Sequence, residues 1–255
     1  MDTLSRTSSY VRDVRKQNPL VVCLTNSVAQ SFNANALLAV GALPIMTSAV
    51  EEIDELVAAA DSLYINIGTA NQPQSILMFE AVRCAARHSK PWVLDPVGVG
   101  VSSFRDNLTR KLIAIDCPAV IRCNVSEILH ICGVPAPQHG VDAVSYGSGY
   151  LWCDDVQRYA RNHRSAVAVS GPADYICYEN RTDWVNGGSP LMTKVTGMGC
   201  TASAIVAACV AVFPNPFDAA YAGMCIMAEA GSRAADKAQG PASLQHHFLD
   251  ELSQL

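Results

Sequence analysis

The chain has 255 residues, of which 50% are hydrophobic and 16% charged, and its formal net charge is -5. Intrinsic disorder is excluded, because disordered chains combine low hydrophobicity with high charge. The acidic balance offers no basic field for nucleic acid or an anionic membrane surface, and the longest apolar stretch, residues 201–213, is too short to span a bilayer.

Ten cysteines are scattered through apolar segments, and no pair of them has the CxxC spacing. A disulfide framework, a zinc ribbon and a thioredoxin-type redox site are therefore not supported. We expect most of these thiols to be buried and reduced. The N-terminal segment mixes charges and contains no apolar core of a signal peptide, so a cytoplasmic protein is expected.

Short apolar runs alternate with longer segments of helical periodicity. Strands are predicted at residues 19–24, 43–46, 63–67, 92–94, 119–122, 166–169, 175–178 and 182–185. Helices are predicted at residues 31–40, 51–60, 74–87, 126–131, 156–163, 200–213, 217–235 and 244–255. This order predicts one α/β domain over residues 1–255, with a mostly parallel sheet and helices on both faces. The last two strands are expected to form an antiparallel hairpin at the sheet edge, and residues 133–150 a polar loop.

In such sheets, ligands bind beyond the carboxyl ends of the strands. Six residues lie at or just past a predicted strand end: Asn26, Met46, Gly68, Asp95, Asn124 and Ser170. Asn26 is either a ligand-binding residue or a plain N-cap. Met46 either lines an apolar pocket or belongs to the core.

The sequence TGMGC at residues 196–200 precedes a helix of small apolar residues. Two glycines and a helix N-terminus together provide inward N–H groups and a positive dipole end, which suit a phosphate. Cys200 would lie at the helix start, where the pKa of a thiol is expected to be lowered. A glycine-rich turn before a core helix explains the motif equally well. The segment matches neither a Walker A loop nor a Rossmann fingerprint.

Asp95 ends an apolar strand before a proline, where it could hold Mg²⁺ directly or through water, or simply form a turn. Arg122 could neutralise a phosphate, and so could Lys194 near the glycine turn. Asn124 and Glu127 could reach Mg²⁺ or its waters, yet their spacing is also that of a capping box. The functional interpretation gains weight because Asp95, Glu127 and the 196–200 turn should meet at one sheet edge.

The segments PLVVCLTNSVAQSFNANALLAVGALPIM, LYINIGT, WVLDPVGVG, IRCNVSEI and LMTKVTGMGCTASA occur in this order, with GPASLQHHFLDEL near the end. Together they resemble the hydroxyethylthiazole kinases, thiamine-salvage enzymes of the ribokinase-like superfamily. The resemblance implies a three-layer αβα ribokinase-like fold. It also implies a kinase that uses ATP and Mg²⁺ to phosphorylate the hydroxyl of 4-methyl-5-(2-hydroxyethyl)thiazole, and a homotrimer with active sites between subunits.

The resemblance also implies roles for individual residues. The thiazole-pocket positions are Met46 and Gly197, with Asn26 nearby. The ATP-binding positions are Arg122 and Ser170, to which we add the neighbouring Asn124, Lys194, Thr196 and Gly199. The metal-associated acids are Asp95 and Glu127. Cys200 stands where most of the superfamily has an aspartate general base, and a cysteine there is typical of this family.

Four departures from the family pattern leave every functional group of the reaction in place. Cys123 replaces a glycine of the family's IRGN segment, Ser170 a threonine and Met198 a smaller residue, and GPAS replaces GPGS near the C-terminus. Three rival functions remain. A hydroxymethylpyrimidine kinase is disfavoured by Cys200 and the Met46 segment, and a cysteine redox protein by the lack of CxxC. A non-catalytic nucleotide- or thiamine-precursor-binding regulator would bind ATP without turnover.

Overall fold

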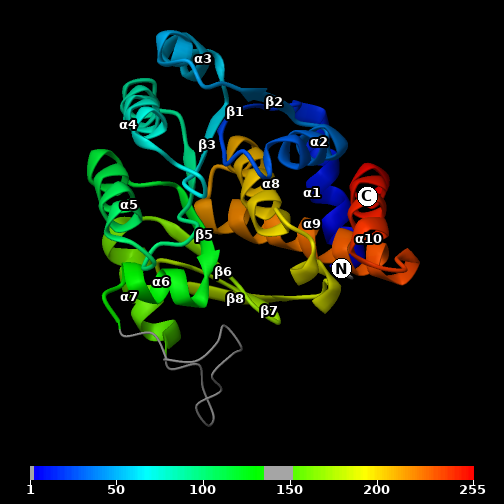
Figure 1. The fold of residues 1–255 in the computed structure, drawn as a ribbon. Coiled ribbons are helices and arrows are strands. Elements are labelled where there is room, and N and C mark those ends of the chain that lie inside the picture. Colours follow the sequence, from blue (N-terminus) through cyan, green and yellow to red (C-terminus); the bar gives the residue numbers. More distant parts are fainter. Residues whose placement is uncertain (1–2, 135–151) are drawn as a thin grey trace.

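The computed structural model describes residues 3–134 and 152–255, which form one sheet enclosed by helices (Figure 1). The strands are β1 (Leu20–Leu24), β2 (Leu43–Met46), β3 (Ser62–Asn66), β4 (Trp92–Asp95), β5 (Val120–Asn124), β6 (Ala166–Ser170), β7 (Ala173–Tyr178) and β8 (Arg181–Asn186). The helices are α1 (Thr3–Gln17), α2 (Gln30–Val40), α3 (Ile53–Ala59), α4 (Gln72–Arg87), α5 (Ser103–Ile115), α6 (Val125–Ile131), α7 (Trp152–His163), α8 (Met198–Val212), α9 (Pro216–Lys237) and α10 (Pro241–Gln254). Two short 3-10 helices are η1 (Val50–Glu52) and η2 (Pro190–Lys194).

The eight strands form a single sheet in the order β2-β1-β3-β4-β5-β6-β7-β8. Pairs from β2 through β6 are parallel, whereas β7 and β8 are antiparallel and close the far edge. Two registers matter for the site: Asn66 of β3 pairs with Asp95 of β4, and Asn124 of β5 pairs with Ser170 of β6. Because these strands are parallel, their carboxyl ends meet at one edge of the sheet.

Successive strand side chains point to opposite faces, and each face buries its own core. Tyr64 and Val93 pack toward α8 and its neighbours, whereas Leu63 and Leu94 pack toward the layer of α4 and α5 (Figure 1). Helix α8 is buried almost throughout, because it lies between the sheet and α9. The predicted α/β fold with a mostly parallel sheet, helices on both faces and an antiparallel hairpin is confirmed.

The structure also corrects the predicted elements. Helices α1 and α5 were not predicted, and the helix expected at residues 51–60 is divided into η1 and α3. The loop expected at residues 133–150 lies outside the described residues except for its first two positions. Within the described residues, no helix is long and apolar enough to cross a membrane.

All ten cysteines lie in the described part of the chain and are free thiols. Six of them are buried, as expected: Cys23, Cys84, Cys123, Cys177, Cys209 and Cys225. Cys123 packs in the core on the face opposite Tyr64 and Val93. Its side chain therefore fills core space instead of entering the crevice at the strand ends.

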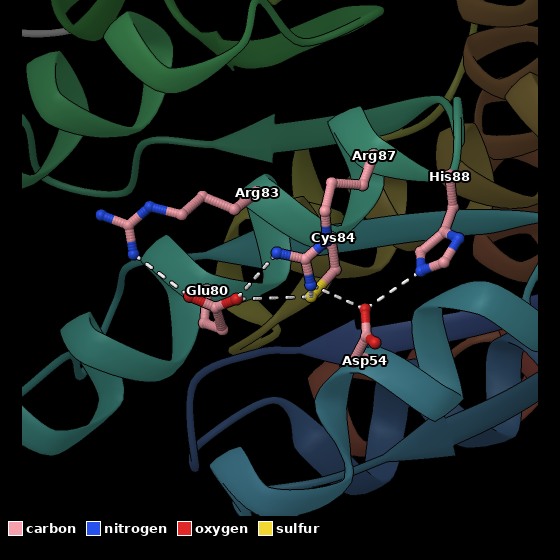
Figure 2. A network of polar contacts seen from close by, with 6 residues as sticks. All are labelled: Asp54, Glu80, Arg83, Cys84, Arg87 and His88. Carbon is pink, nitrogen blue, oxygen red and sulfur yellow. Dashed lines mark hydrogen bonds and ion pairs between the residues drawn. The ribbon is translucent and has the colours of Figure 1, made fainter.

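A polar network joins α3 to α4 on the outside of the sheet (Figure 2). Asp54 accepts hydrogen bonds from Arg87 at 2.8 Å and from His88 at 3.0 Å. Arg87 also pairs with Glu80 at 3.3 Å and approaches the sulfur of Cys84 at 3.1 Å. Arg87 and then His88 lower the pKa of Asp54. Since these charges are largely exposed, water and salt screen them, and the network orients the two helices more than it stabilises them.

Helices α8 and α9 cross closely at Gly223. A β-carbon at this position would lie 2.6 Å from Val206 Cγ2 and 3.0 Å from the Val206 Cα atom. The second contact is to backbone, which cannot move aside as a flexible side chain can.

We predict that Gly223→Ala lowers the free energy of unfolding by about 1–3 kcal/mol, because overpacking outweighs the usual helical gain from alanine. The measurement is urea unfolding. The matched control is Gly231→Ala in the same helix, where the added methyl group meets chiefly the flexible end of Met192. Equal or greater stability of Gly223→Ala would contradict the tight crossing.

Candidate active site

The carboxyl ends of five parallel strands and the first turn of α8 meet at one edge of the sheet, and the space between them is called the crevice below. The hydrogen bonds and charge interactions described below bring together eight of the residues expected from the sequence: Asn26, Asp95, Arg122, Asn124, Glu127, Ser170, Gly199 and Cys200. Gly197 begins the helix that carries Cys200. Lys194 and Thr196 are exposed, and Met46 is half-buried against the core, so the structure gives these three no direct contact with that cluster.

Asp95 is the buried acid at the centre of this crevice, with 1% of its surface exposed. Its Oδ2 atom accepts hydrogen bonds from Asn66 Nδ2 at 2.7 Å and Ser203 Oγ at 2.8 Å, and Tyr64 OH lies at 3.4 Å. Burial raises the pKa of Asp95 to about 6, and the Glu127 charge acts in the same direction. Arg122, Ser203 and Asn66 oppose this rise. The carboxylate is thus held near Arg122 and Glu127 by donors from β3 and α8.

The start of α8 depends on Gly197, which is the N-cap in the left-handed region at φ +86°. A side chain there would be strained, and its β-carbon would lie 3.1 Å from Ala29 Cβ. The Gly197 carbonyl accepts the first helical bond from Thr201 N at 2.8 Å. The N–H groups of Gly199 and Cys200 precede this bond and have no partner within the helix. The glycine turn is therefore a true helix start at the sheet edge.

Cys200 lies in this first turn, and its sulfur accepts a hydrogen bond from Asn26 Nδ2 at 3.1 Å. Asn26 is not the N-cap of α2; its Oδ1 atom accepts from Ala29 N at 3.0 Å in the turn before the helix. The expected low pKa of Cys200 is wrong. Burial raises the pKa and the Asp95 charge raises it further, against lowering contributions from Asn26, Asn66 and Arg122.

Arg122 projects from β5 onto the first turn of α8. A β-carbon at position 199 would lie 2.8 Å from Arg122 Nη1, so glycine leaves the space that the guanidinium occupies. Arg122 Nη2 donates to the hydroxyl of Ser170 on β6. The Nε atom is buried and donates to no group in the described part of the chain. A cation and a helix N-terminus thus lie together, which is a favourable arrangement for an anion.

Glu127 and Asn124 form a capping box, which is one of the two roles that the sequence allowed for them. Asn124 Oδ1 accepts from Glu127 N, and Glu127 Oε2 accepts from Asn124 N, both at 2.9 Å. Glu127 Oε1 also accepts from Gly98 N at 2.8 Å, in the loop that follows Asp95. This second bond ties the cap of α6 to the end of β4, and it places the Glu127 carboxylate beside the site.

Four contributors to the site were missed in the sequence. Asn66, Tyr64 and Ser203 surround Asp95, and Tyr64 OH also donates to the Cys200 carbonyl at 2.9 Å. Arg105 of the unpredicted helix α5 donates to the Ile67, Gly68 and Val97 carbonyls, which fixes the loops after β3 and β4. The one available signal was a polar residue, Asn66, within the apolar strand LYINI.

The carboxylates of Asp95 and Glu127 have oxygens available for a magnesium ion. In the described residues, the hydrogen bonds of Asp95 all end at Oδ2, and each Glu127 oxygen accepts one backbone N–H. Asp95 Oδ1 and the second lone pairs of Glu127 remain for a hard cation or its waters. The described residues contain no group of three or more His, Cys, Asp or Glu side chains that could hold a metal ion. The site therefore suits Mg²⁺ that is shared with phosphate and water rather than one enclosed by protein ligands.

Comparison with known proteins places this geometry in a family. Residues 11–255 match the model of the hydroxyethylthiazole kinase family. The chain belongs to this family. A hydroxyethylthiazole kinase of Granulibacter bethesdensis is 42% identical over 247 residues, which cover 97% of this chain and 89% of the relative.

Solved structures agree with this assignment. The hydroxyethylthiazole kinase protein of Pyrococcus horikoshii OT3 superimposes with a TM-score of 0.89 at 32% identity, covering 98% of this chain and 94% of the other. A ribokinase-like superfamily protein of Enterococcus faecalis V583 gives a TM-score of 0.70 at 13% identity, covering 96% and 89%. The second likeness shows the fold alone. The chain thus has the ribokinase-like, three-layer α/β fold.

We predict that Cys200 is protonated at neutral pH, because burial and Asp95 raise its pKa above the ordinary thiol value. Its alkylation by iodoacetamide, followed by peptide mass spectrometry, is expected to be slow at pH 7. The rate should still rise about tenfold per pH unit at pH 9, since only the thiolate reacts. The same peptide in unfolded protein should level off earlier. A plateau below pH 8 in the folded protein would contradict the prediction.

Proposed function

We propose that this protein transfers the γ-phosphoryl group of ATP to the hydroxyl of 4-methyl-5-(2-hydroxyethyl)thiazole. Family membership supports the reaction class. The observation that carries the proposal is the position of the Arg122 guanidinium. It lies against Gly199 in the first turn of α8, one residue before Cys200. Phosphoryl transfer depends chiefly on positioning and charge stabilisation, and this arrangement supplies both.

The phosphate side of the site is proposed to consist of the first turn of α8 and Arg122. The N–H groups of Gly199 and Cys200 and the unpartnered Nε of Arg122 are donors for the transferring phosphoryl oxygens. Ser170 holds the guanidinium in place through its hydroxyl. Asn124, Lys194 and Thr196 are proposed as further ATP-binding residues at the rim, where Lys194 and Thr196 are exposed to solvent.

Cys200 is proposed to orient the substrate hydroxyl and to accept its proton late in the transfer, while the proton of the thiol itself passes to an oxygen of the transferring phosphoryl group, so that the sulfur is neutral before and after the step. Its raised pKa means that the thiol is neutral when the substrate binds. A neutral group does not repel the γ-phosphate of ATP, whereas a permanent thiolate would. In a loose transition state, proton removal is needed only once the oxygen is partly bonded to phosphorus.

Asp95 and Glu127 are proposed to hold Mg²⁺ by the oxygens that their hydrogen bonds leave available. When bound, the ion would neutralise phosphate charge and bridge phosphate oxygens. The protein prepares for this by keeping both carboxylates in fixed orientations. Asn66 and Ser203 orient Asp95, while the backbone N–H groups of Asn124 and Gly98 orient Glu127.

The thiazole side is proposed to involve Met46, Gly197 and Asn26, completed by a neighbouring subunit of a homotrimer. Met46 ends the edge strand β2, and large apolar side chains around that edge are exposed in the single chain: Val28, Leu38, Leu43 and Val50. Burying such a patch against another subunit is favourable. We also propose that the protein acts in the cytoplasm, because ten free thiols fit a reducing compartment.

The proposal is tested by incubating the protein with ATP, Mg²⁺ and a panel of thiazole, pyrimidine and sugar alcohols, with product detection by mass spectrometry. Only the thiazole alcohol should give a phosphate ester. Preferential turnover of hydroxymethylpyrimidine would assign a different kinase. Binding of ATP without any ester would favour a regulator. Sedimentation of a fully active monomer would contradict the trimer.

We predict that Cys200→Ala lowers kcat by about 10–10³-fold, the lower part of which is the usual contribution of a general base. Cys200→Asp should retain activity, because a carboxylate can accept the same proton at the helix start. Steady-state kinetics at saturating ATP and Mg²⁺ measures both variants. Loss of all activity in a folded Cys200→Asp would indicate a packing role, and unchanged kcat in Cys200→Ala would remove the thiol from the mechanism.

We predict that Glu127→Ala lowers kcat by on the order of 10²-fold, because a misplaced metal or phosphate has a cost of this size. It also loses the Glu127 half of the capping box and the bond to Gly98 N, which together cost about 0.5–2 kcal/mol of stability. The control is Asn215→Ala, which removes the cap of α9 beyond the opposite end of α8. The two variants should lose similar stability, and only Glu127→Ala should lose activity. Activity of Glu127→Ala within threefold of wild type would leave Glu127 a purely structural role.

A further inference from the structure

Asn66 is a buried amide at the end of β3 whose contacts reach beyond the orientation of Asp95. Its Nδ2 atom donates to Asp95 Oδ2 at 2.7 Å and to Tyr64 OH at 3.0 Å. Its Oδ1 atom accepts from Asn26 Nδ2 and from Gly68 N, both at 2.9 Å. An amide has two N–H donors and two oxygen lone pairs, so all of its bonding capacity is used.

These partners fix the direction of every bond. Gly68 N is a backbone donor, so the oxygen of Asn66 must face it, and the nitrogen must face the carboxylate of Asp95. The oxygen of Asn66 then demands a donor from Asn26. Asn26 is oriented in the same sense at its other end, because its Oδ1 atom accepts from Ala29 N at 3.0 Å.

The consequence reaches Cys200. With one N–H of Asn26 committed to Asn66, the second N–H points to the sulfur, where Nδ2 and Sγ are 3.1 Å apart. If the amide of Asn26 turned over, its oxygen would face the oxygen of Asn66, and the sulfur would lose its donor. The orientation of one amide thus decides whether the thiol has a hydrogen-bond donor beside it.

We propose that Asn66 is a positioning residue that fixes the amide of Asn26 and thereby holds the sulfur of Cys200 for phosphoryl transfer. The inference rests on the function proposed above, because it takes Cys200 as the group that meets the substrate hydroxyl. Asn66 acts largely through Asn26, which carries the printed hydrogen bond to the sulfur, and adds a smaller contribution of its own to the pKa of the thiol. The same amide holds Asp95, so one side chain sets the orientation of both the acid and the thiol.

A donor at the sulfur favours the thiolate, so its loss should make Cys200 harder to ionise. The charged groups that act on the thiol are Asp95 from β4, which raises its pKa, and Arg122 from β5, which lowers it. Tyr64 from β3 is the other titratable group that interacts with the thiol. All three groups are retained in the variants below. Asn26→Ala leaves the bond between Asn66 and Asp95 in place, so its shift reports on the sulfur's donor alone, whereas Asn66→Ala also removes a hydrogen bond from Asp95.

The test compares wild type, Asn66→Ala, Asn26→Ala and the double variant, using the pH dependence of Cys200 alkylation followed by peptide mass spectrometry. Each single variant should move the midpoint upward by about half a pH unit or more, the worth of one hydrogen bond. Because Asn66 acts largely through Asn26, the double variant should shift the midpoint by clearly less than the sum of the two single shifts. In the kinase assay, Asn66→Ala should lower kcat about tenfold and change the KM for ATP less than threefold.

The matched control is Ser62→Ala on the same strand, which removes another buried bond from β3 to α8, between Ser62 Oγ and the Ala207 carbonyl at 2.6 Å. It should leave the alkylation profile unchanged. Full additivity of the two asparagine variants would overturn the inference, as would an equal shift in the control. If Asn66→Ala does not fold, Asn66→Ser takes its place, since a serine hydroxyl is too short to bridge Asp95 and Asn26.

Alkylation requires no turnover, so the two proposals fail separately. A normal kinase assay combined with an unmoved alkylation midpoint in the folded variants refutes the role of Asn66 alone. If the midpoints shift as expected but the protein phosphorylates no thiazole alcohol, the proposed function is refuted. The effect of Asn66 on the sulfur of Cys200 is then still supported.

Discussion

Burying the carboxylate of Asp95 requires hydrogen-bond donors from two elements besides its own strand. An ionised carboxylate removed from water is several kcal/mol too costly unless the protein replaces its hydration. Asn66 from β3 and Ser203 from α8 supply the shortest of these bonds. The acid therefore cannot be buried unless α8 lies across the strand ends at one particular height. That placement is also what brings the N-terminal turn of α8 over the crevice.

The parallel sheet makes this arrangement possible through its register. Asn66 and Asp95 are paired neighbours, so their side chains point to the same face and meet without any detour of the backbone. Arg122 lies on that face too, whereas Cys123, one residue later, packs in the opposite core. A cysteine at position 123 therefore leaves the space around Arg122 and Gly199 free.

The strands could be predicted from sequence because nearly all are short, apolar runs between helical segments. This pattern lies within each segment and requires no knowledge of the strands beside it. Helix α5 could not, because its buried residues Leu108 and Leu112 recur only every fourth position among charged neighbours. Its Arg105 is nonetheless what secures the loops after β3 and β4.

The site was accessible from sequence where a residue lies just past a strand end, as Asp95 and Asn124 do. The role of Asn66 could not be predicted, because it depends on Asp95 in the neighbouring strand. Neither segment alone indicates that β3 pairs with β4. The pKa of Cys200 was misjudged for the same reason. The helix start that lowers a thiol pKa is visible in TGMGC, whereas the burial and the Asp95 charge that raise it come from elsewhere in the chain.

The protonated state of Cys200 has a consequence for the durability of the enzyme. Peroxides attack thiolates, and the first product, a sulfenic acid, would place a polar oxygen in the first turn of α8. A thiol that Asp95 and burial keep neutral presents little of the reactive form. The burial and the Asp95 charge that raise the pKa of Cys200 therefore also shield its sulfur from oxidants, and the thiol can persist without a resolving cysteine.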